Sequence, residues 1–300
     1  MALPSLLHVR RRHADRASSA TGSPAATKAS PSRPVSDVDI KRSTRLRRAF
    51  VTLASLFYLL SFVFLVLVDI GNTHNKPVLR QIYFFKLDLA DIVPLSVPNA
   101  GLINSIARTL GLHDFYQVGL WNFCEGYNDV GITHCSKPKD LYWFDPVRII
   151  LSELLAGATI ALPTEVVTLL HILRLVSHLM FGFFLSATVL AFVLVFATPL
   201  ALLSRWWSLP FALISLVALL LTLAGSAIGT AISLAFKYAA ESRSDLNIHV
   251  YVGTRMFVFM WLATGFALFA FAVHAGLGCC CASRRDIRNG RRPVKGAATG

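Results

Sequence analysis

Four long apolar runs constrain this chain more than any other feature of its sequence. The first, residues 49–68, contains twenty residues without a charge, and a helix of that length crosses about 30 Å of hydrocarbon. The other three runs are 176–203, 209–236 and 254–278. Membrane-spanning β-strands would instead give alternating segments of about ten residues, and the sequence shows none. The sequence therefore predicts an all-α integral membrane protein built as a bundle of four transmembrane helices.

The composition excludes an ordinary soluble domain. Hydrophobic residues make up 55% of the chain and charged residues only 15%, and the mean hydropathy is +0.58. The first apolar run is long and follows a polar segment, residues 1–48. We therefore interpret it as a signal anchor that stays in the protein, because a cleaved signal peptide is shorter and begins near the N-terminus.

The charge distribution predicts the orientation in the membrane. Residues 1–48 carry eleven Lys or Arg against three Asp, and 282–300 carry six against one. The loop 69–171 has seven basic and ten acidic residues. Because basic segments stay on the cytoplasmic side, both ends are predicted to be cytoplasmic and this long loop extracellular. The net charge of +13 then reflects topology and attraction to anionic lipid of the inner leaflet, with no need for nucleic acid as a partner.

The four spans divide the rest of the chain into five segments. We predict a disordered basic cytoplasmic arm at 1–48, an extracellular loop at 69–175, a short cytoplasmic loop at 204–208, an extracellular loop at 237–253 and a basic cytoplasmic tail at 279–300. An alternative remains open for the arm, because its first 36 residues are rich in Arg, Ser and Ala like a mitochondrial transit peptide. The Pro-, Gly- and Ser-containing tract at 18–34 favours a disordered linker.

The stretch "VGLWNFCEGYNDVGITHCSKP" (118–138) holds two of the five cysteines in the long outer loop. On the oxidising side of a membrane, Cys124 and Cys135 are expected to form a disulfide, which would stabilise the loop by about 2–3 kcal/mol. Two free thiols or a metal pair are the alternative, although no nearby His or Cys spacing completes a zinc site.

Turn residues and aromatic segments around this cysteine pair predict a small sheet. Gly126 and Gly131 supply turn residues between the cysteines, and the flanking segments 116–121 and 141–145 are aromatic and prone to form strands. The disulfide would then staple the turn of a β-containing extracellular loop. Trp121 and Trp143 would cover this sheet or lie at the membrane surface.

Together these residues resemble a known signature. Gly119-Leu120-Trp121 followed by Cys124 and Cys135 resembles the claudin-type loop. With "WFDP" at 143–146 and "LPTEV" at 162–166, the wider pattern is similar to the fungal tetraspan family of PalI and the eisosome, or cortical-patch, proteins. That resemblance implies a fungal plasma-membrane protein that organises membrane domains linked to the cell wall and endocytosis, with a structural role for the cysteine motif. PalI-type members have a long hydrophilic C-terminal region, whereas this chain has about twenty residues after the fourth span.

The outer loop contains two further candidate helices. Charges interrupt the stretch 146–180, and its first half is too charged to span, so we predict an amphipathic helix on the outer membrane surface, broken near Pro163 and leading into the second span. A packed loop helix without lipid contact is the alternative. A short helix is also expected over 101–110.

Small and ionisable residues mark positions within or beside the spans. Gly225 and Gly229 form a G-x-x-x-G pattern that allows close helix packing, within the bundle or between copies. His178, Arg255 and His274 lie near span ends, where their side chains can extend toward an interface. Three cysteines directly after the fourth span are candidates for S-acylation, with inert thiols as the alternative: Cys279, Cys280 and Cys281.

The sequence carries no recognisable catalytic motif, and we expect neither enzyme activity nor a cofactor or metal. We predict a non-enzymatic organiser of plasma-membrane domains that associates laterally with copies of itself or with other membrane proteins, and that can meet cell-wall or cortical proteins. The alternative is a membrane sensor or channel regulator, acting in ambient-pH signalling of the PalI type or in calcium influx during mating. No Asp or Glu lies deep in any span, which disfavours a pump.

Overall fold

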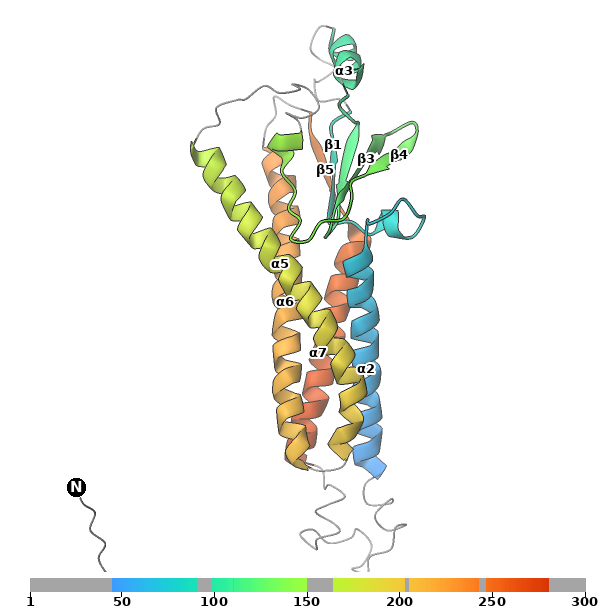
Figure 1. The fold of residues 1–300 in the computed structure, drawn as a ribbon, viewed down its shortest axis with the longest axis vertical. Coiled ribbons are helices and arrows are strands. Elements are labelled where there is room, and N and C mark those ends of the chain that lie inside the picture. Colours follow the sequence, from blue (N-terminus) through green and yellow to red (C-terminus); the bar gives the residue numbers. More distant parts are fainter. Residues whose placement is uncertain are drawn as a thin grey trace, which may run out of the picture. The chain divides into compact units, whose positions relative to one another are not determined.

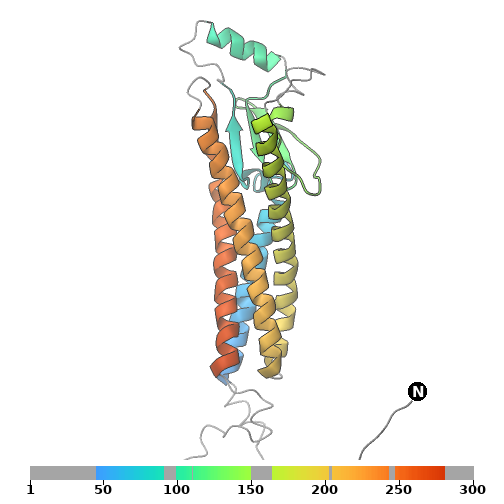
Figure 2. The same ribbon diagram turned by 90° about the vertical axis from the view of Figure 1, so that its left-hand side faces the viewer.

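Four long helices run side by side, and a small antiparallel sheet packs on one end of them (Figures 1 and 2). The computed structural model describes residues 45–90, 99–109, 111–149, 164–202, 205–242 and 247–280. Most of the predicted basic arm, the break near Pro163 and the tail beyond Cys280 lie outside the described residues.

The helices are α2 (Arg45–Ile70), α5 (Thr164–Ala197), α6 (Arg205–Glu241) and α7 (Thr254–Cys280). Each contains a segment long and apolar enough to cross a membrane: Arg47–Ile70, Val167–Leu200, Pro210–Glu241 and Thr254–Gly276. The predicted fold class, a four-helix membrane bundle with a disulfide-stapled, β-containing loop, is confirmed.

The helices form a ring in which each packs against two neighbours. Helix α2 contacts α5 and α7, and α6 contacts the same two helices from the other side. Only about a third of each candidate span is buried, and the outward positions are also apolar, as at Phe196 and Leu213, which are 68% and 63% exposed. A helix that is apolar on its outward face as well as its inward face suits a lipid environment.

Helix α5 is longer at its outer end than the span predicted at 176–203. It runs without interruption from Thr164 into the membrane segment, so residues 164–175 of the predicted surface helix are continuous with the second span. The start of the predicted surface helix, residues 146–149, is also helical. The outer turns of α5 lean away from α6 (Figure 1), and Val167, Leu169 and Ile172 are exposed there.

The sheet combines strands from both loops at the same end of the bundle. The long loop supplies β1 (Phe85–Asp88), β2 (Phe115–Val118), β3 (Phe123–Tyr127) and β4 (Gly131–Cys135), and the second loop supplies β5 (His249–Val252). The strand order is β4-β3-β2-β1-β5, and every neighbouring pair is antiparallel. Two 3-10 segments, η1 (Leu79–Gln81) and η2 (Thr198–Leu202), and helix α3 (Ala100–Thr109) are also present, and residues 146–149 are helical.

The strand predicted over 141–145 is wrong. This segment has no regular structure, and Leu141 takes a left-handed φ of 51°. Its aromatic residues serve the core instead: Phe144 is buried and its ring lies edge-on to Phe85 (5.6 Å) and Phe236 (5.9 Å). A β-prone aromatic run therefore packs beneath the sheet rather than adding a strand to it.

The inner face of the sheet continues directly into the helix bundle. Along β1, Phe85 and Leu87 are buried while Lys86 and Asp88 are partly exposed, which is the alternation of a sheet with one covered face. Phe85 stacks on Phe236 of α6 at 4.4 Å. One apolar cluster contains buried residues of the sheet, of the sheet-side halves of α2 and α7, and of the middle of α5. The sheet and the bundle thus share a single core.

Helix α3 matches the short helix expected over 101–110 and lies beyond the sheet (Figure 1). Its last turn is held by Arg108, which donates to Asp129 Oδ1 at 2.6 Å and lies over the Tyr127 ring. The hydrogen bond from Arg108 lowers the pKa of the exposed Asp129 carboxyl below its ordinary value.

The two glycines of the third span face the inside of the bundle. A methyl group at Gly225 would lie 3.3 Å from the Phe184 ring of α5, and one at Gly229 would lie 2.9 Å from Phe84 and 3.2 Å from Met260 Sδ of α7. Glycine at these positions lets α6 approach its neighbours within one copy of the protein.

We expect Gly229→Ala to destabilise the bundle by about 1–3 kcal/mol, because the added methyl overpacks a filled site. The measurement is the thermal transition of the purified protein in detergent, followed by size-exclusion chromatography. Gly265→Ala in α7 is the matched control, since a methyl there meets nothing within 4 Å. Equal transition temperatures for both variants would contradict the packing role.

Candidate functional site: the junction of sheet and helices

The predicted disulfide between Cys124 and Cys135 is present, so the alternative of free thiols or a metal pair is wrong. The two residues are direct partners in the β3–β4 ladder, with Cα atoms 4.0 Å apart. The disulfide therefore joins two strands across the sheet and closes the hairpin at the end opposite its turn. Gly131 in that turn has a φ of +89°, a conformation that favours glycine.

The Gly119-Leu120-Trp121 motif forms the β2–β3 turn and touches three other parts of the fold. A methyl group at Gly119 would lie 2.8 Å from Asn72 Cβ and 3.0 Å from the Gly71 carbonyl oxygen, so only glycine lets the turn reach the end of α2. Leu120 is buried in the shared core. Trp121 packs edge-on against Phe181 of α5 at 4.6 Å. The motif is thus a contact point between the sheet and two helices.

Asn72 holds the end of α2 to the sheet. It takes a left-handed φ of 59°, its N–H donates to Leu79 O at 3.0 Å, and its side-chain amide donates to Gln117 O of β2 at 3.0 Å. Asn72 is not among the residues predicted from the sequence. The sequence feature that could have indicated it is the Gly71-Asn72 pair after the first apolar run, because such a pair is typical of a helix C-terminus.

Asn122 connects three segments beside the disulfide. Its buried side-chain nitrogen donates to Ser136 O at 2.9 Å and to Thr73 O at 3.3 Å, and its backbone carbonyl oxygen accepts from the Gly119 N–H at 2.9 Å. Asn122-Phe123-Cys124 has the form of a weak N-glycosylation sequence. The side-chain nitrogen of Asn122, however, is buried and already hydrogen-bonded within the fold. No pattern in the sequence indicated this structural role.

The backbone of Phe84 links the two outer loops. Its N–H donates to Val118 O at 2.8 Å, and its carbonyl oxygen accepts from the Gly253 N–H at 3.0 Å. A side chain at Gly253 would collide with the Tyr83 carbonyl oxygen. The start of α7 is therefore fixed against the same strand that carries Phe85.

A buried phenol lies under the sheet. Burial raises the pKa of Tyr142 well above its ordinary value, and the nearby carboxylates of Asp145 and Glu125 raise it further. Tyr142 therefore stays neutral at physiological pH. Its ring stacks on Phe123 with centroids 6.5 Å apart.

Polar contacts join the helices inside the bundle, both between neighbours and across the ring. Thr188 of α5 donates to the buried Asp69 carboxylate at 2.7 Å, and Tyr58 of α2 donates to Ser215 Oγ of α6 at 2.6 Å. Ser226 of α6 and Thr264 of α7 are also hydrogen-bonded, at 3.0 Å. Such bonds between membrane helices contribute about 0.6 kcal/mol each. Asp69, which our sequence analysis assigned to the loop, is part of α2.

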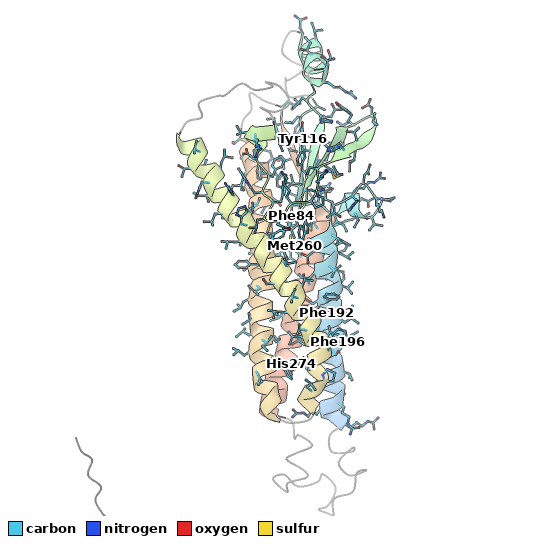
Figure 3. All side chains as sticks on the ribbon, viewed as in Figure 1. Phe84, Tyr116, Phe192, Phe196, Met260 and His274 are labelled. Carbon is cyan, nitrogen blue, oxygen red and sulfur yellow. A yellow bond between two sulfur atoms is a disulfide. The ribbon has the colours of Figure 1, made fainter. Side chains whose placement is uncertain are left out.

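His274 does not extend toward an interface, so that expectation is wrong. It is fully buried, its ring stacks on Tyr58 with centroids 5.6 Å apart, and Phe211 lies beside it (Figure 3). The aromatic rings of two other helices enclose it. Arg255, by contrast, is exposed at the start of α7, and His178 is partly exposed.

The three candidate acylation sites lie at or beyond the end of α7. Cys279 and Cys280 are its last two residues, and Cys281 lies outside the described residues. Within the described ranges, no group of three or more His, Cys, Asp or Glu residues could hold a metal ion.

Four membrane-length helices capped at one end by a disulfide-closed sheet, drawn from both loops on that side, define a four-span membrane protein with an integral sheet domain. The sequence profile of the SUR7/PalI family matches residues 50–273, so the chain belongs to this family. The resemblance inferred from the loop motif is thereby confirmed.

Two relatives of the chain come from yeasts. It is 26% identical to Protein PUN1 of Saccharomyces cerevisiae over 83% of this chain and 98% of that protein. It is 22% identical to SUR7 family protein pun1 of Schizosaccharomyces pombe over 68% of this chain and 85% of that protein. Both alignments are long enough to include most of the bundle and sheet.

Replacing both disulfide cysteines by serine is expected to lower the free energy of unfolding by about 2–3 kcal/mol, because the unfolded loop regains its freedom. Thermal transitions of the purified protein with and without reductant measure this change. Reductant should lower the transition of the parent protein and leave that of the double variant unchanged. A parent protein insensitive to complete reduction would contradict the stabilising role.

Asn122→Ala is expected to destabilise the sheet by about 1–3 kcal/mol, because buried carbonyl oxygens lose their donor. Limited proteolysis of the outer domain provides the measurement, with faster cleavage expected. Asn128→Ala is the control, since Asn128 is exposed in the β3–β4 turn. Equal cleavage rates in the two variants would show that Asn122 has no such role.

Proposed function

We propose that this protein is a plasma-membrane tetraspan that organises membrane domains of the eisosome, or cortical-patch, type without enzymatic activity. Both termini are cytoplasmic, and the sheet domain faces the cell wall. Membership of the SUR7/PalI family supports a role of this kind. The observation that carries the proposal is the continuous core between the sheet and the helix ends.

That continuous core makes the outer domain and the bundle one mechanical unit. A partner that binds the sheet and reorients it would therefore also reorient the helices, because Phe85 and Phe144 pack directly on Phe236 of α6. A tethered, independently mobile loop would not have this property. A rigid unit can hold a fixed position between the wall and the membrane.

The orientation rests on two independent arguments. The basic residues flank the helix ends opposite the sheet, and such residues are retained in the cytoplasm. The disulfide lies in the sheet, and disulfides persist on the oxidising side of a membrane. Both arguments support a position of the sheet outside the cell.

Lateral association and lipid contact are the means by which such a unit would gather into domains. The outward faces of the four helices are apolar and remain available to lipid or neighbouring membrane proteins. Acylation of Cys279, Cys280 or Cys281 would add a second membrane anchor beside the fourth span. The basic segments would add attraction to anionic inner-leaflet lipid.

The proposal is tested by imaging a C-terminal fluorescent fusion in the living fungus. Immobile patches at the cell cortex are expected for the parent protein, with loss or reduction of patches for Cys124→Ser/Cys135→Ser. Cys279→Ser/Cys280→Ser/Cys281→Ser is the control for cysteine removal, and it separates the role of acylation from that of the disulfide. Surface biotinylation of intact cells confirms arrival at the plasma membrane.

Other distributions would overturn the proposal in different ways. A tubular mitochondrial signal would exclude both the location and the predicted topology. An even plasma-membrane signal, combined with altered calcium influx or poor growth at alkaline pH after deletion, would favour the sensor or channel regulator instead.

A further inference from the structure

A groove of about 570 Å³ lies on the outward face of the sheet, the face opposite the shared core. Its walls come from four parts of the fold: the segment around η1, the central strands, the β3–β4 turn and the start of α7. The lining residues are Arg80, Gln81, Tyr83, Lys86, Phe115, Gln117, Asn128, Gly131, Ile132, Val252, Thr254 and Arg255.

The charge of this groove is entirely positive. Arg80, Lys86 and Arg255 line it, and no Asp or Glu is among the lining residues. None of the three forms a salt bridge with any of the residues that the structure describes. Cations that face one cavity without an internal counter-ion attract an anion from outside.

The other lining groups are hydrogen-bond donors and aromatic rings. Gln81, Gln117 and Asn128 offer amides, and Thr254 and Tyr83 offer hydroxyls. The ammonium of Lys86 lies 3.8 Å above the centre of the Phe115 ring, which fixes its position on the sheet. Arginine and lysine with such neighbours match the oxygens of a phosphate group and of a polar head group attached to it.

The groove lies at the depth of lipid head groups. Thr254 and Arg255 are the first two residues of α7, whose candidate membrane span also begins at Thr254. Arg80 follows the end of α2, whose span ends at Ile70. The phosphate layer begins where the hydrocarbon ends, so a lipid beside the bundle brings its phosphate to this level without leaving the membrane.

We propose that this groove binds the phosphate and head group of an anionic phospholipid in the leaflet on the sheet side. Arg80 and Arg255 contact the phosphate from the helix ends, and Lys86 contacts it from the sheet. The amides and hydroxyls of the wall bind the remainder of the head group. The assignment to the outer leaflet rests on the proposed orientation, whereas the binding itself does not.

The test uses the full-length protein purified in a neutral detergent and titrated with dihexanoyl phosphatidylinositol. Saturable binding is expected for the parent protein, and dihexanoyl phosphatidylcholine and inorganic phosphate are expected to bind at least about tenfold more weakly. The variant Arg80→Gln/Lys86→Gln/Arg255→Gln should weaken binding of the anionic lipid by at least about tenfold.

A second triple variant controls for net charge. Lys76→Gln/Lys137→Gln/Lys139→Gln removes the same charge from exposed positions on the sheet side that do not line the groove. Its affinity should match that of the parent protein. The thermal transition and the intact disulfide of both triple variants verify folding, and Lys86→Arg, which keeps the charge, should retain binding.

Three results would overturn the proposal. Equal weakening in the two triple variants would show diffuse attraction to net charge. Equal affinity for inorganic phosphate would assign the groove to free phosphate rather than to a lipid. Absence of saturable binding by the folded parent protein would exclude the site altogether.

These results are independent of the domain-organising role. Loss of lipid binding with cortical patches intact would leave that role standing. Lipid binding by the purified protein, together with a sheet found on the cytoplasmic side of cells, would move the site to the inner leaflet and contradict the proposed orientation.

Discussion

The packing of the sheet's inner face on the outer ends of the helices is the contact on which the rest of the structure depends. Strands of four or five residues form a sheet that is marginal by itself in water, and it gains stability by burying one face. Phe85 supplies the centre of this contact, because it stacks on Phe236 and meets Phe144. The helices gain as well, since only about a third of each span is buried among the other helices.

Two local features hold the sheet in a fixed position on the helix ends. The Gly119 turn fits against Asn72 at the end of α2, and the disulfide holds β4 to the sheet where this edge strand has little burial of its own. The Phe84 backbone connects the same strand region to the start of α7. These local contacts tie both sheet-forming loops to the membrane helices, so the sheet domain cannot reorient freely.

As a result, each face of the molecule has a different chemical character. The inner face of the sheet is apolar and filled, its outer face carries the cationic groove, and the outward sides of the helices are apolar. The polar bonds within the bundle, such as that between Thr188 and Asp69, are directed at neighbouring helices. The surfaces that remain available for partners are therefore the lipid-facing helices and the exposed face of the sheet.

The sequence by itself determined the four spans, because hydrocarbon thickness fixes the length of an apolar helix regardless of what the helix packs against. It also predicted the disulfide and a small sheet, since turn glycines and β-prone aromatic flanks beside two cysteines are local signals. Only the tertiary structure decided that β1 and β5 complete the sheet, because 85–88 and 249–252 pair across more than 160 residues of chain. It also placed 141–145 in the core rather than in a strand, and it buried His274. Those outcomes depend on which aromatic surfaces meet in space, which propensity and hydropathy along the chain do not encode.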